Sequence, residues 1–261
     1  IHIPFIIAGP GIEKGSVCDT PIHLIDLFPT YMAMAGAETE TELDLDGCNV
    51  LPVILGQESV VKLADGSARE SLFWHQPSVR PASSVIRKGD WKLRLNYAPE
   101  LNGLPALSLY KLYNDDGSLC DLGEVNNLAE SHPEKTNVML AELQEWLAKY
   151  DAPLPYKNAQ PDGGARLPGA ERVPAVLKKQ SAGNRIDVLV ETGADKSKVI
   201  EAKLIYTTNG SDLLWYRKSQ EEWFEAPAEI SGGTVSAIAP PGMTHGVFYL
   251  RDENGFMITS E

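Results

Sequence analysis

The clearest alternation of hydrophobic and polar positions lies between Leu72 and Leu95. An aromatic run that ends at Pro77 is followed, after a polar gap, by a second run that turns at residues 88–90. Strict alternation follows this turn, in the order Trp91, Lys92, Leu93, Arg94, Leu95 and Asn96. Such a pattern is typical of a strand with one buried and one solvated face. It predicts strands of a small antiparallel sheet with one apolar and one basic face.

A continuous apolar run at Ile3–Ala8 lacks this alternation. It favours a strand covered on both faces, as in the parallel sheet of an α/β domain. Because such a strand needs neighbours, we expect the chain to be part of a longer protein. A helix is predicted next, with Thr20 as its N-cap, Pro21 in its first turn and Gly36 at its end. Pro29 inside it predicts a kink or two short helices.

The pattern further along predicts a short helical turn at Val50–Leu55, a surface loop at Glu58–Arg69 and another strand at Leu107–Tyr113. A capping box begins at Ser131 and precedes an apolar stripe that runs to Tyr150. The stripe indicates an amphipathic helix of about 17 residues, which we expect to lie across the small sheet.

The last third of the chain has a different pattern. Pro and Gly recur between Asp151 and Gly183, which indicates a linker or extended arm. Short strands are then predicted at Arg185–Val190, Val199–Thr207, Leu213–Arg217, Glu222–Glu225, Thr234–Ala239, Val247–Arg251 and Phe256–Ser260. Strands at this spacing suggest a β-sandwich of immunoglobulin-like type. We therefore expect a first region at residues 1–158, a linker at 159–172 and an all-β domain at 173–261.

Composition narrows the function. The net charge of −13 argues against a nucleic-acid partner, and a hydrophobic fraction of 43% argues against extensive disorder. No hydrophobic run approaches the length of a transmembrane helix. Cys18, Cys48 and Cys120 have no metal-binding spacing. Buried or half-buried free thiols are expected for them, and a disulfide between Cys18 and Cys48 stays an alternative.

Common catalytic motifs are absent from the sequence, including the nucleotide-binding glycine loops, HExxH and GxSxG. Among the five histidines, His75 is the strongest candidate for a role at a site, because it lies where a predicted strand ends at Pro77. An aromatic pair in the β-rich domain, Trp215 and Trp223, is expected in its core or on a sugar-binding face.

A resemblance joins several of these segments. The chain is similar to the sulfatases at residues 1–11, at the S-x-x-D-T-P-x-x-x-x-D-L-x-P-T pattern of 16–30, at Leu45-Asp46-Gly47, and at 72–75, 86–93, 109–112 and 124–129. These pieces occur in the sulfatase order over residues 1 to about 158. The chain resembles the C-terminal part of an arylsulfatase-type hydrolase of the alkaline-phosphatase-like α/β superfamily, with the small sheet and its helix.

The resemblance also implies what lies elsewhere. Sulfatases convert the Cys or Ser of a C/S-x-P-x-R motif to formylglycine and bind calcium through Asp and Asn. This sequence contains no C/S-x-P-x-R, so we expect no catalytic or metal-binding residue and no cofactor in this chain. Formylglycine and calcium are expected in an N-terminal catalytic half, which is the implied partner. The chain alone is therefore expected to be inactive as a sulfatase.

The remaining expectation is a rim of the substrate pocket. His2 stands where the family often has Arg, His75 occupies the family's Trp-His position, and Arg80 and Arg87 are cations that fit a sulfated sugar. We predict these four as substrate-binding residues of a sulfuric ester hydrolase that acts on sulfated carbohydrate, in the periplasm or secreted. The alternative is a non-catalytic carbohydrate-binding or interaction module that uses Trp215, Tyr216 or Trp223.

Overall fold

A computed structural model of the chain describes residues 3–37, 45–78, 81–159, 166–210 and 221–260. The chain forms two compact units. One comprises Ile1–Gln76, Ser83–Leu95 and Leu107–Ala152, and the other comprises Pro77–Ala82, Asn96–Ala106 and Pro153–Glu261.

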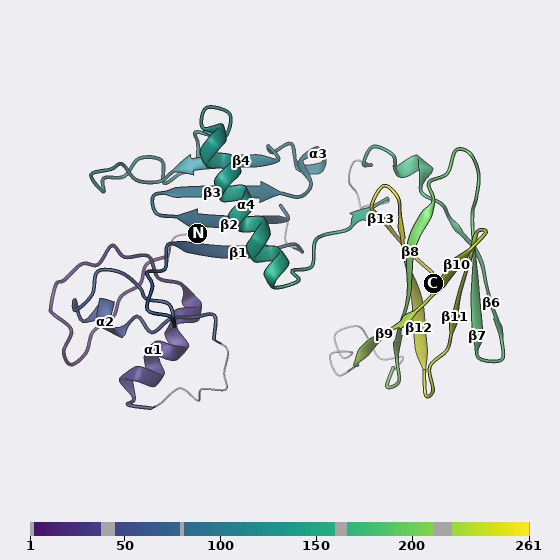
Figure 1. Cartoon of the computed structure of the whole chain (residues 1–261), viewed down its shortest axis with the longest axis horizontal. Helices are drawn as coiled ribbons and strands as arrows, with labels where there is room; N and C mark the ends of the chain where they lie inside the picture. The colour runs from purple at the N-terminus through teal and green to yellow at the C-terminus, as the bar shows by residue number, and fades with distance from the viewer. Residues whose placement is uncertain (1–2, 38–44, 79–80, 160–165, 211–220, 261) are drawn as a thin grey trace. The chain divides into compact units, whose positions relative to one another are not determined.

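The first unit contains a four-stranded sheet in the order β1-β2-β3-β4 (Figure 1). Its strands are β1 (Ser71–Gln76), β2 (Ser83–Lys88), β3 (Trp91–Asn96) and β4 (Leu107–Lys111). The pairs β1–β2 and β3–β4 are antiparallel. The 17-residue helix α4 (Pro133–Lys149) lies across one face. The small antiparallel sheet with a covering helix, predicted from the sequence, is confirmed.

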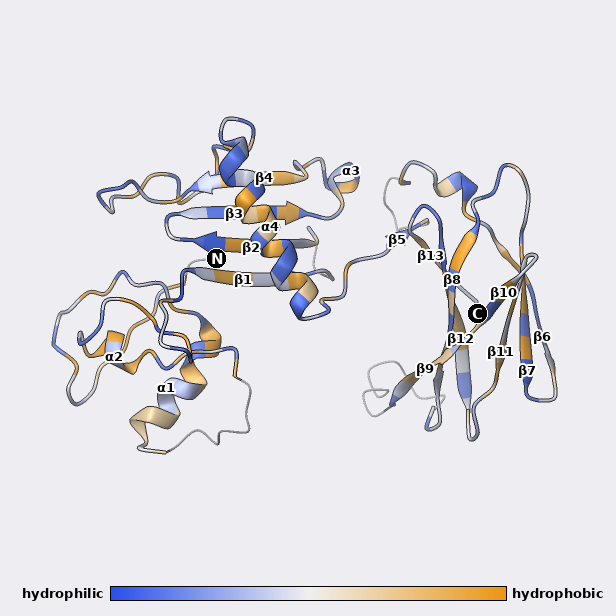
Figure 2. Ribbon diagram, in the orientation of Figure 1, coloured by the Kyte–Doolittle hydropathy of each residue, from blue (hydrophilic) through white to orange (hydrophobic). Residues whose placement is uncertain are grey.

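Alternate side chains of the strands bury themselves under α4. Ile86, Leu93 and Leu109 form one cluster with Met139, Leu143 and Leu147 of the helix. Figure 2 shows hydrophobic residues in β2, β3 and β4, between hydrophilic ones. The rings of Phe73 and Trp146 stack at 4.9 Å between centroids. Trp91, on the apolar side of the alternating run, packs against the same cluster.

Two local predictions for this unit are wrong. The sheet face away from α4 was expected to be solvated, but Lys92 on this face is only 6% exposed. Glu124, in the loop after β4, covers Lys92 and pairs with its ammonium group. The predicted capping box does not form. His132 is the N-cap without a side-chain cap bond, and the Ser131 hydroxyl donates to the Leu128 carbonyl instead, at 3.1 Å.

The N-terminal part of this unit is less regular. Residues 3–8 form no strand, and Ile6 is 92% exposed. The predicted strand is therefore wrong within this chain, since a strand needs a neighbour to accept its backbone hydrogen bonds. The predicted helix begins later, as a 3₁₀ turn η1 (Leu24–Asp26) followed by α1 (Leu27–Met34), with Pro29 in the first turn of α1. The short helix α2 (Leu51–Ile54) confirms the predicted helical turn.

The second unit contains two sheets. One has the order β10-β11-β7-β6 and the other β5-β13-β12-β8-β9. The strands are β5 (Lys157–Asn158), β6 (Val176–Ala182), β7 (Arg185–Val190), β8 (Val199–Thr207), β9 (Trp223–Pro227), β10 (Glu229–Ser231), β11 (Thr234–Ile238), β12 (His245–Asp252) and β13 (Phe256–Thr259). Both sheets contribute to one hydrophobic cluster, which includes Val188, Leu204, Val235, Phe248 and Leu250.

Several predicted features of the rest of the chain need correction. Val176–Ala182 is strand β6, whereas the sequence predicted a linker there. The prediction failed because the side chains of this outer strand are mostly exposed and polar. The strands β5 and β10, the short helix α3 (Pro99–Asn102) and the 3₁₀ turn η2 (Ala170–Arg172) have no counterpart in the prediction. The strand expected at Leu213–Arg217 lies outside the described residues.

The three thiols are free, with Cys48 buried, whereas Cys18 and Cys120 are exposed rather than buried. In the part of the chain that the structure describes, no helix is long and apolar enough to cross a membrane.

Candidate functional site

A buried ion pair ties together the N-terminal segment of the first unit. The Asp26 carboxylate is fully buried and accepts two hydrogen bonds from the Arg69 guanidinium, at 2.6 and 2.8 Å. It also accepts the backbone N–H groups of His23 at 2.7 Å and Cys48 at 2.9 Å. Every charge of this pair is therefore satisfied inside the unit. The loop predicted at Glu58–Arg69 thus ends in a residue whose side chain is only 8% exposed.

Electrostatics follow this geometry. Burial alone raises the pKa of Asp26, but the hydrogen bonds from Arg69, Cys48 and His23 outweigh it and hold the pKa below its ordinary value. Burial lowers the pKa of His23. The carboxylate of Asp26 is therefore a structural anion, saturated with donors, and has no free lone pair for proton transfer.

Two further residues complete this junction. The hydroxyl of Thr30 donates to the Asp26 carbonyl at 2.6 Å and accepts the Val50 N–H at 2.9 Å. At Gly47 the chain passes so close to the preceding helix that an added Cβ would lie 2.1 Å from the Ile25 carbonyl oxygen. Only glycine fits there.

The structure places two of the four predicted substrate-binding residues, His75 and Arg87. His75 pairs with Ser84 across β1 and β2, and its Nδ1 lies 2.7 Å from the Ser84 hydroxyl. Arg87 lies three positions along from Ser84, so its side chain points to the other face of the sheet. The two side chains therefore do not line one pocket. His2 and Arg80 lie outside the described residues.

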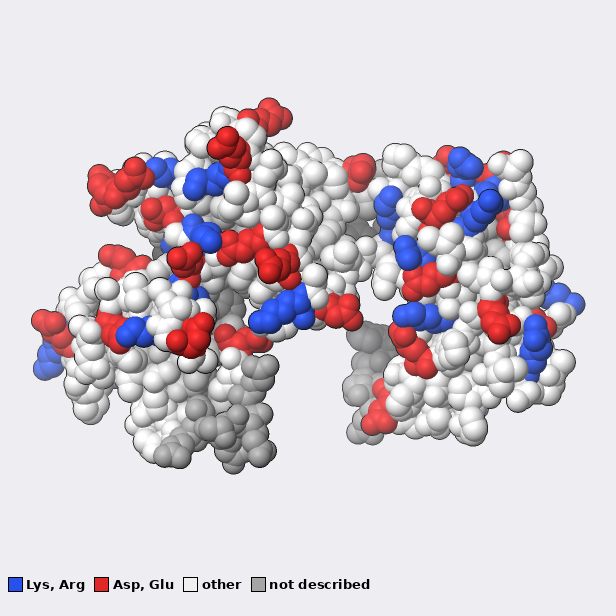
Figure 3. Space-filling model, in the orientation of Figure 1, with Lys and Arg blue, Asp and Glu red and all other residues white. Residues whose placement is uncertain are grey.

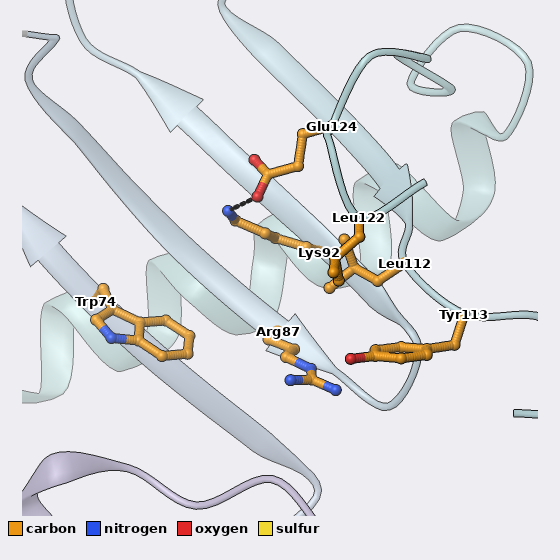
Figure 4. A pocket seen from close by; sticks show the side chains of 7 residues that line it. All are labelled: Trp74, Arg87, Lys92, Leu112, Tyr113, Leu122 and Glu124. Atoms are coloured by element: carbon orange, nitrogen blue, oxygen red, sulfur yellow. Dashed lines mark hydrogen bonds and ion pairs between the residues drawn. The ribbon is translucent and has the colours of Figure 1, made fainter. Parts of the chain in front are cut away.

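Arg87 borders a small cavity of about 30 Å³ on the sheet face away from α4 (Figure 4). Its guanidinium extends between Trp74 and Tyr113 and lies 5.5 Å from the centre of the Tyr113 ring. The ion pair of Lys92 with Glu124 forms another wall. Glu124 has a left-handed backbone, with φ at 57°, which is uncommon for a residue other than glycine.

Arg87 also lines a larger groove of about 440 Å³, which we call the Arg87 groove. One side is the turn between β2 and β3, and the other comes from residues 20–21 and 59–61. Its lining residues are Thr20, Pro21, Ser59, Val60, Val61, Arg69, Glu70, Leu72, Arg87, Lys88, Gly89, Asp90 and Trp91. Such a volume is within the range of small-molecule sites. Acidic and basic side chains are otherwise intermixed on the face of the molecule in Figure 3.

These residues do not assemble a metal site. Among the described residues, no group of three His, Cys, Asp or Glu side chains is close enough to hold a metal ion. The calcium ion that the sequence resemblance implies therefore has no fitting ligand set in the described part of this chain. The arrangement around Arg87 fits binding of an anionic or hydroxylated ligand instead.

Some residues of these sites were missed in the sequence. Arg69 fell in a predicted surface loop, and Tyr113 and Glu124 fell near a turn and in an irregular segment. Asp26 was signalled only as a charge in an apolar stretch, whereas Arg69, 43 residues further along, stands among polar and charged residues. Their pairing depends on the fold, which the sequence pattern does not give.

Comparisons with known proteins identify relatives of part of the chain. Arylsulfatase K of Danio rerio is 27% identical over 133 residues, which is 51% of this chain and 23% of that protein. Arylsulfatase K of Homo sapiens is 28% identical over 138 residues, or 52% of this chain and 24% of that protein. Steryl-sulfatase of Rattus norvegicus is 37% identical over 57 residues, which is 22% of this chain and 10% of that protein. No protein-family profile matches.

The chain is a partial sulfatase homologue. It spans about a quarter of the length of the arylsulfatase K relatives it matches. The sulfatase-like pattern at residues 16–30 contains Asp26 and Thr30, and the Leu-Asp-Gly that follows contains Gly47. In this chain those three residues build the buried junction rather than a reactive centre.

Proposed function

We propose that this chain is the C-terminal portion of a sulfuric ester hydrolase that acts on sulfated carbohydrate. The observation that carries the proposal is its similarity to sulfatases over about half of its length. The junction of Asp26, Thr30 and Gly47 supports it, because the residues of the sulfatase-like patterns have a coherent structural use here.

Catalysis requires groups that this chain does not bring together. The sequence has no C/S-x-P-x-R to become formylglycine, and the described residues offer no calcium ligand set. A sulfuryl transfer needs a nucleophile and cations that stabilise the developing charge. We therefore assign formylglycine and calcium to an N-terminal catalytic half, and the chain alone is inactive.

Uncovered apolar side chains support this partner. In the first unit Phe5 and Ile6 are exposed, and so are Leu24, Phe28 and Tyr31, which follow one another at helical spacing along η1 and α1. Exposed apolar residues gathered in this way mark interaction sites. The catalytic half would cover them, and residues 3–8 would pair as a strand with its sheet.

The second unit has a strand arrangement that supports an immunoglobulin-like β-sandwich. If β6 and β7 are named A and B, β8 is C, β10 and β11 are D and E, and β12 and β13 are F and G. The two sheets then read D-E-B-A and G-F-C, the constant-type immunoglobulin order, with β9 added beside C and β5 beside G. We propose this domain, beyond a linker at 159–172, as an appended module of the hydrolase, which functions in the periplasm or outside the cell.

Activity of two versions of the protein tests the proposal. The 261-residue chain with added calcium should not hydrolyse an aryl sulfate, whereas the product of the complete gene, carrying an upstream C/S-x-P-x-R, should do so. The control is that complete product with its Cys or Ser nucleophile changed to Ala, which should be inactive. Turnover by the 261-residue chain at the rate of an intact sulfatase would overturn the inactivity, and an inactive complete product would overturn the hydrolase.

The second candidate is a non-catalytic carbohydrate-binding module. Trp223 supports it, because its side chain is 48% exposed on β9 rather than packed in the core. Trp215 and Tyr216 lie outside the described residues. Loss of sugar binding in a Trp223→Ala variant, together with a gene that lacks an upstream C/S-x-P-x-R, would favour this candidate over the hydrolase.

A further inference from the structure

The cations around the Arg87 groove differ in how far they are already neutralised. Arg69 is held by the buried Asp26 carboxylate. Lys88 lies 2.9 Å from a Glu142 oxygen and 3.3 Å from a Glu70 oxygen. Both cations therefore have anionic partners within the unit.

Arg87 is different. Its Nε donates to the Gly89 carbonyl at 3.3 Å, and its guanidinium lies against the Tyr113 ring. No carboxylate among the described residues forms an ion pair with it, although the chain has 36 acidic residues. The terminal N–H groups of a guanidinium form a planar fork that suits two oxygens of one anion. Arg87 thus keeps donors for a ligand at the edge of the groove.

The other walls of the groove combine apolar side chains with a few polar groups. Glu70 and Asp90 line the groove, and a carboxylate oxygen can accept a hydrogen bond from a sugar hydroxyl. The Thr20 hydroxyl also lines it and donates to the Ser59 carbonyl. Trp91 is a poor stacking platform, because Lys135 lies 4.9 Å and Lys111 5.8 Å from its ring centre. Recognition here would use charge and hydrogen bonds rather than stacking on a sugar ring.

We infer that the Arg87 groove is a binding subsite for one sugar of an oligosaccharide that carries an anionic group, sulfate or carboxylate, with Arg87 as the residue that selects the anion. This anion is not the ester that the hydrolase would cleave, since the sequence has no C/S-x-P-x-R to supply the formylglycine nucleophile. The identification of the ligand as a sulfated or uronic carbohydrate rests on the proposed function. Binding in the groove does not require catalysis.

Calorimetric titration of the 261-residue chain tests the inference with three probes. They are a disaccharide with one sulfate, a disaccharide with one uronic acid and no sulfate, and the neutral disaccharide of the same backbone. The sulfated or the uronic probe should bind at least tenfold more tightly than the neutral one, and the tighter of the two identifies the anion. Equal binding of all three, or binding of none, would overturn the inference.

Variants locate the site. Arg87→Gln should lower the affinity for the anionic probe about tenfold or more and leave the weak binding of the neutral probe unchanged. Arg87→Lys keeps the charge but loses the fork, so its affinity should fall between those of wild type and Arg87→Gln. Glu70→Gln removes a nearby negative charge and should raise the affinity for the anionic probe by about two- to fivefold. The matched control is Arg172→Gln, an exposed cation of the other unit, which should bind as wild type does.

Thermal unfolding of each variant verifies that the fold is intact before titration. If Arg87→Gln is folded and binds the anionic probe as wild type does, the inference is wrong. Since the titration needs no turnover, a complete gene product without sulfatase activity would refute the hydrolase while leaving this subsite standing. Conversely, an active sulfatase whose Arg87→Gln variant binds unchanged would refute only the subsite.

Discussion

Two parts of the first unit are held together in opposite ways. The sheet with α4 is stabilised by apolar packing, with Ile86, Leu93, Leu109 and Leu143 fully buried. The N-terminal segment before β1 has a much smaller apolar cluster around Val50 and relies on the buried Asp26 carboxylate.

The two parts differ in how far their apolar side chains are covered. Apolar side chains of the sheet have a covering helix, whereas many of those in the N-terminal segment remain exposed, such as Ile6 and Phe28. A buried ion pair fixes geometry but contributes less net stability than packing of the same volume. The N-terminal segment therefore has a defined local structure and exposed apolar side chains, which the catalytic half proposed above would cover.

The largest effect should come from breaking the ion pair. Asp26→Asn leaves the Arg69 guanidinium buried without a counter-charge, and we expect a loss of about 3–5 kcal/mol in the stability of the N-terminal segment. Hydrogen exchange of peptides from residues 20–70 measures it. Asp65→Asn, at an exposed turn, is the control and should change protection little. Equal effects of both variants would contradict a special role of the pair.

Removal of packing under α4 should come next. Leu143→Ala opens a cavity among fully buried side chains, and we expect a loss of about 3 kcal/mol, within the usual range for such truncations. Urea denaturation followed by exchange of the β2 and β3 peptides reports it. The exposed Val138 on the same helix provides the control, since Val138→Ala should cost less than about 0.5 kcal/mol. The idea of an apolar core fails if the two substitutions are equivalent.

The two parts of the first unit should differ in their stability to acid. Because the folded pKa of Asp26 lies below its ordinary value, its contribution to stability is complete above the unfolded pKa of about 3.9 and is lost as the pH falls through the folded pKa. Peptides around Asp26 should lose exchange protection as the pH falls below about 4, before those of β3 and α4. Asp26→Asn should abolish this difference. An unchanged profile in the variant would assign the acid sensitivity to another group.

The smallest effect is expected at the surface of the sheet. The Lys88 ammonium donates a hydrogen bond to a Glu142 carboxylate oxygen at 2.9 Å. The side chains are partly exposed, Glu142 at 29% and Lys88 at 38%. Glu142→Gln should therefore cost only about 0.5 kcal/mol at low salt and less at high salt. A loss of about 3 kcal/mol or more would show that this pair is as important as the one at Asp26.

Local pattern was sufficient for much of the sheet and its helix. Alternation from Trp91 to Leu95 predicted β3, and the apolar stripe predicted the 17 residues of α4. These signals succeed because burial on one face imposes a period of two or 3.6 residues. The strands at Arg185–Val190 and Val199–Thr207 were predicted with their observed bounds for the same reason.

The remaining features depend on contacts between distant segments. An apolar run at Ile3–Ala8 has the composition of a strand, but pairing requires a neighbour, and none is supplied by the described residues. The opposite faces of His75 and Arg87 follow from register, which the sequence alone does not give. Strand β6 escaped prediction because exposure on an outer strand removes the hydrophobic alternation.

The junction of Asp26 with Arg69 also has a consequence for the order of folding. Its two residues are 43 positions apart, whereas the turn between β2 and β3 joins strands over two residues. Closing the longer loop costs more chain entropy, so the hairpin should form early and the ion pair late. Substitutions at Asp26 should then accelerate unfolding while leaving the folding rate nearly unchanged. The segment that meets the proposed partner would be the last of this unit to become ordered and the first to open.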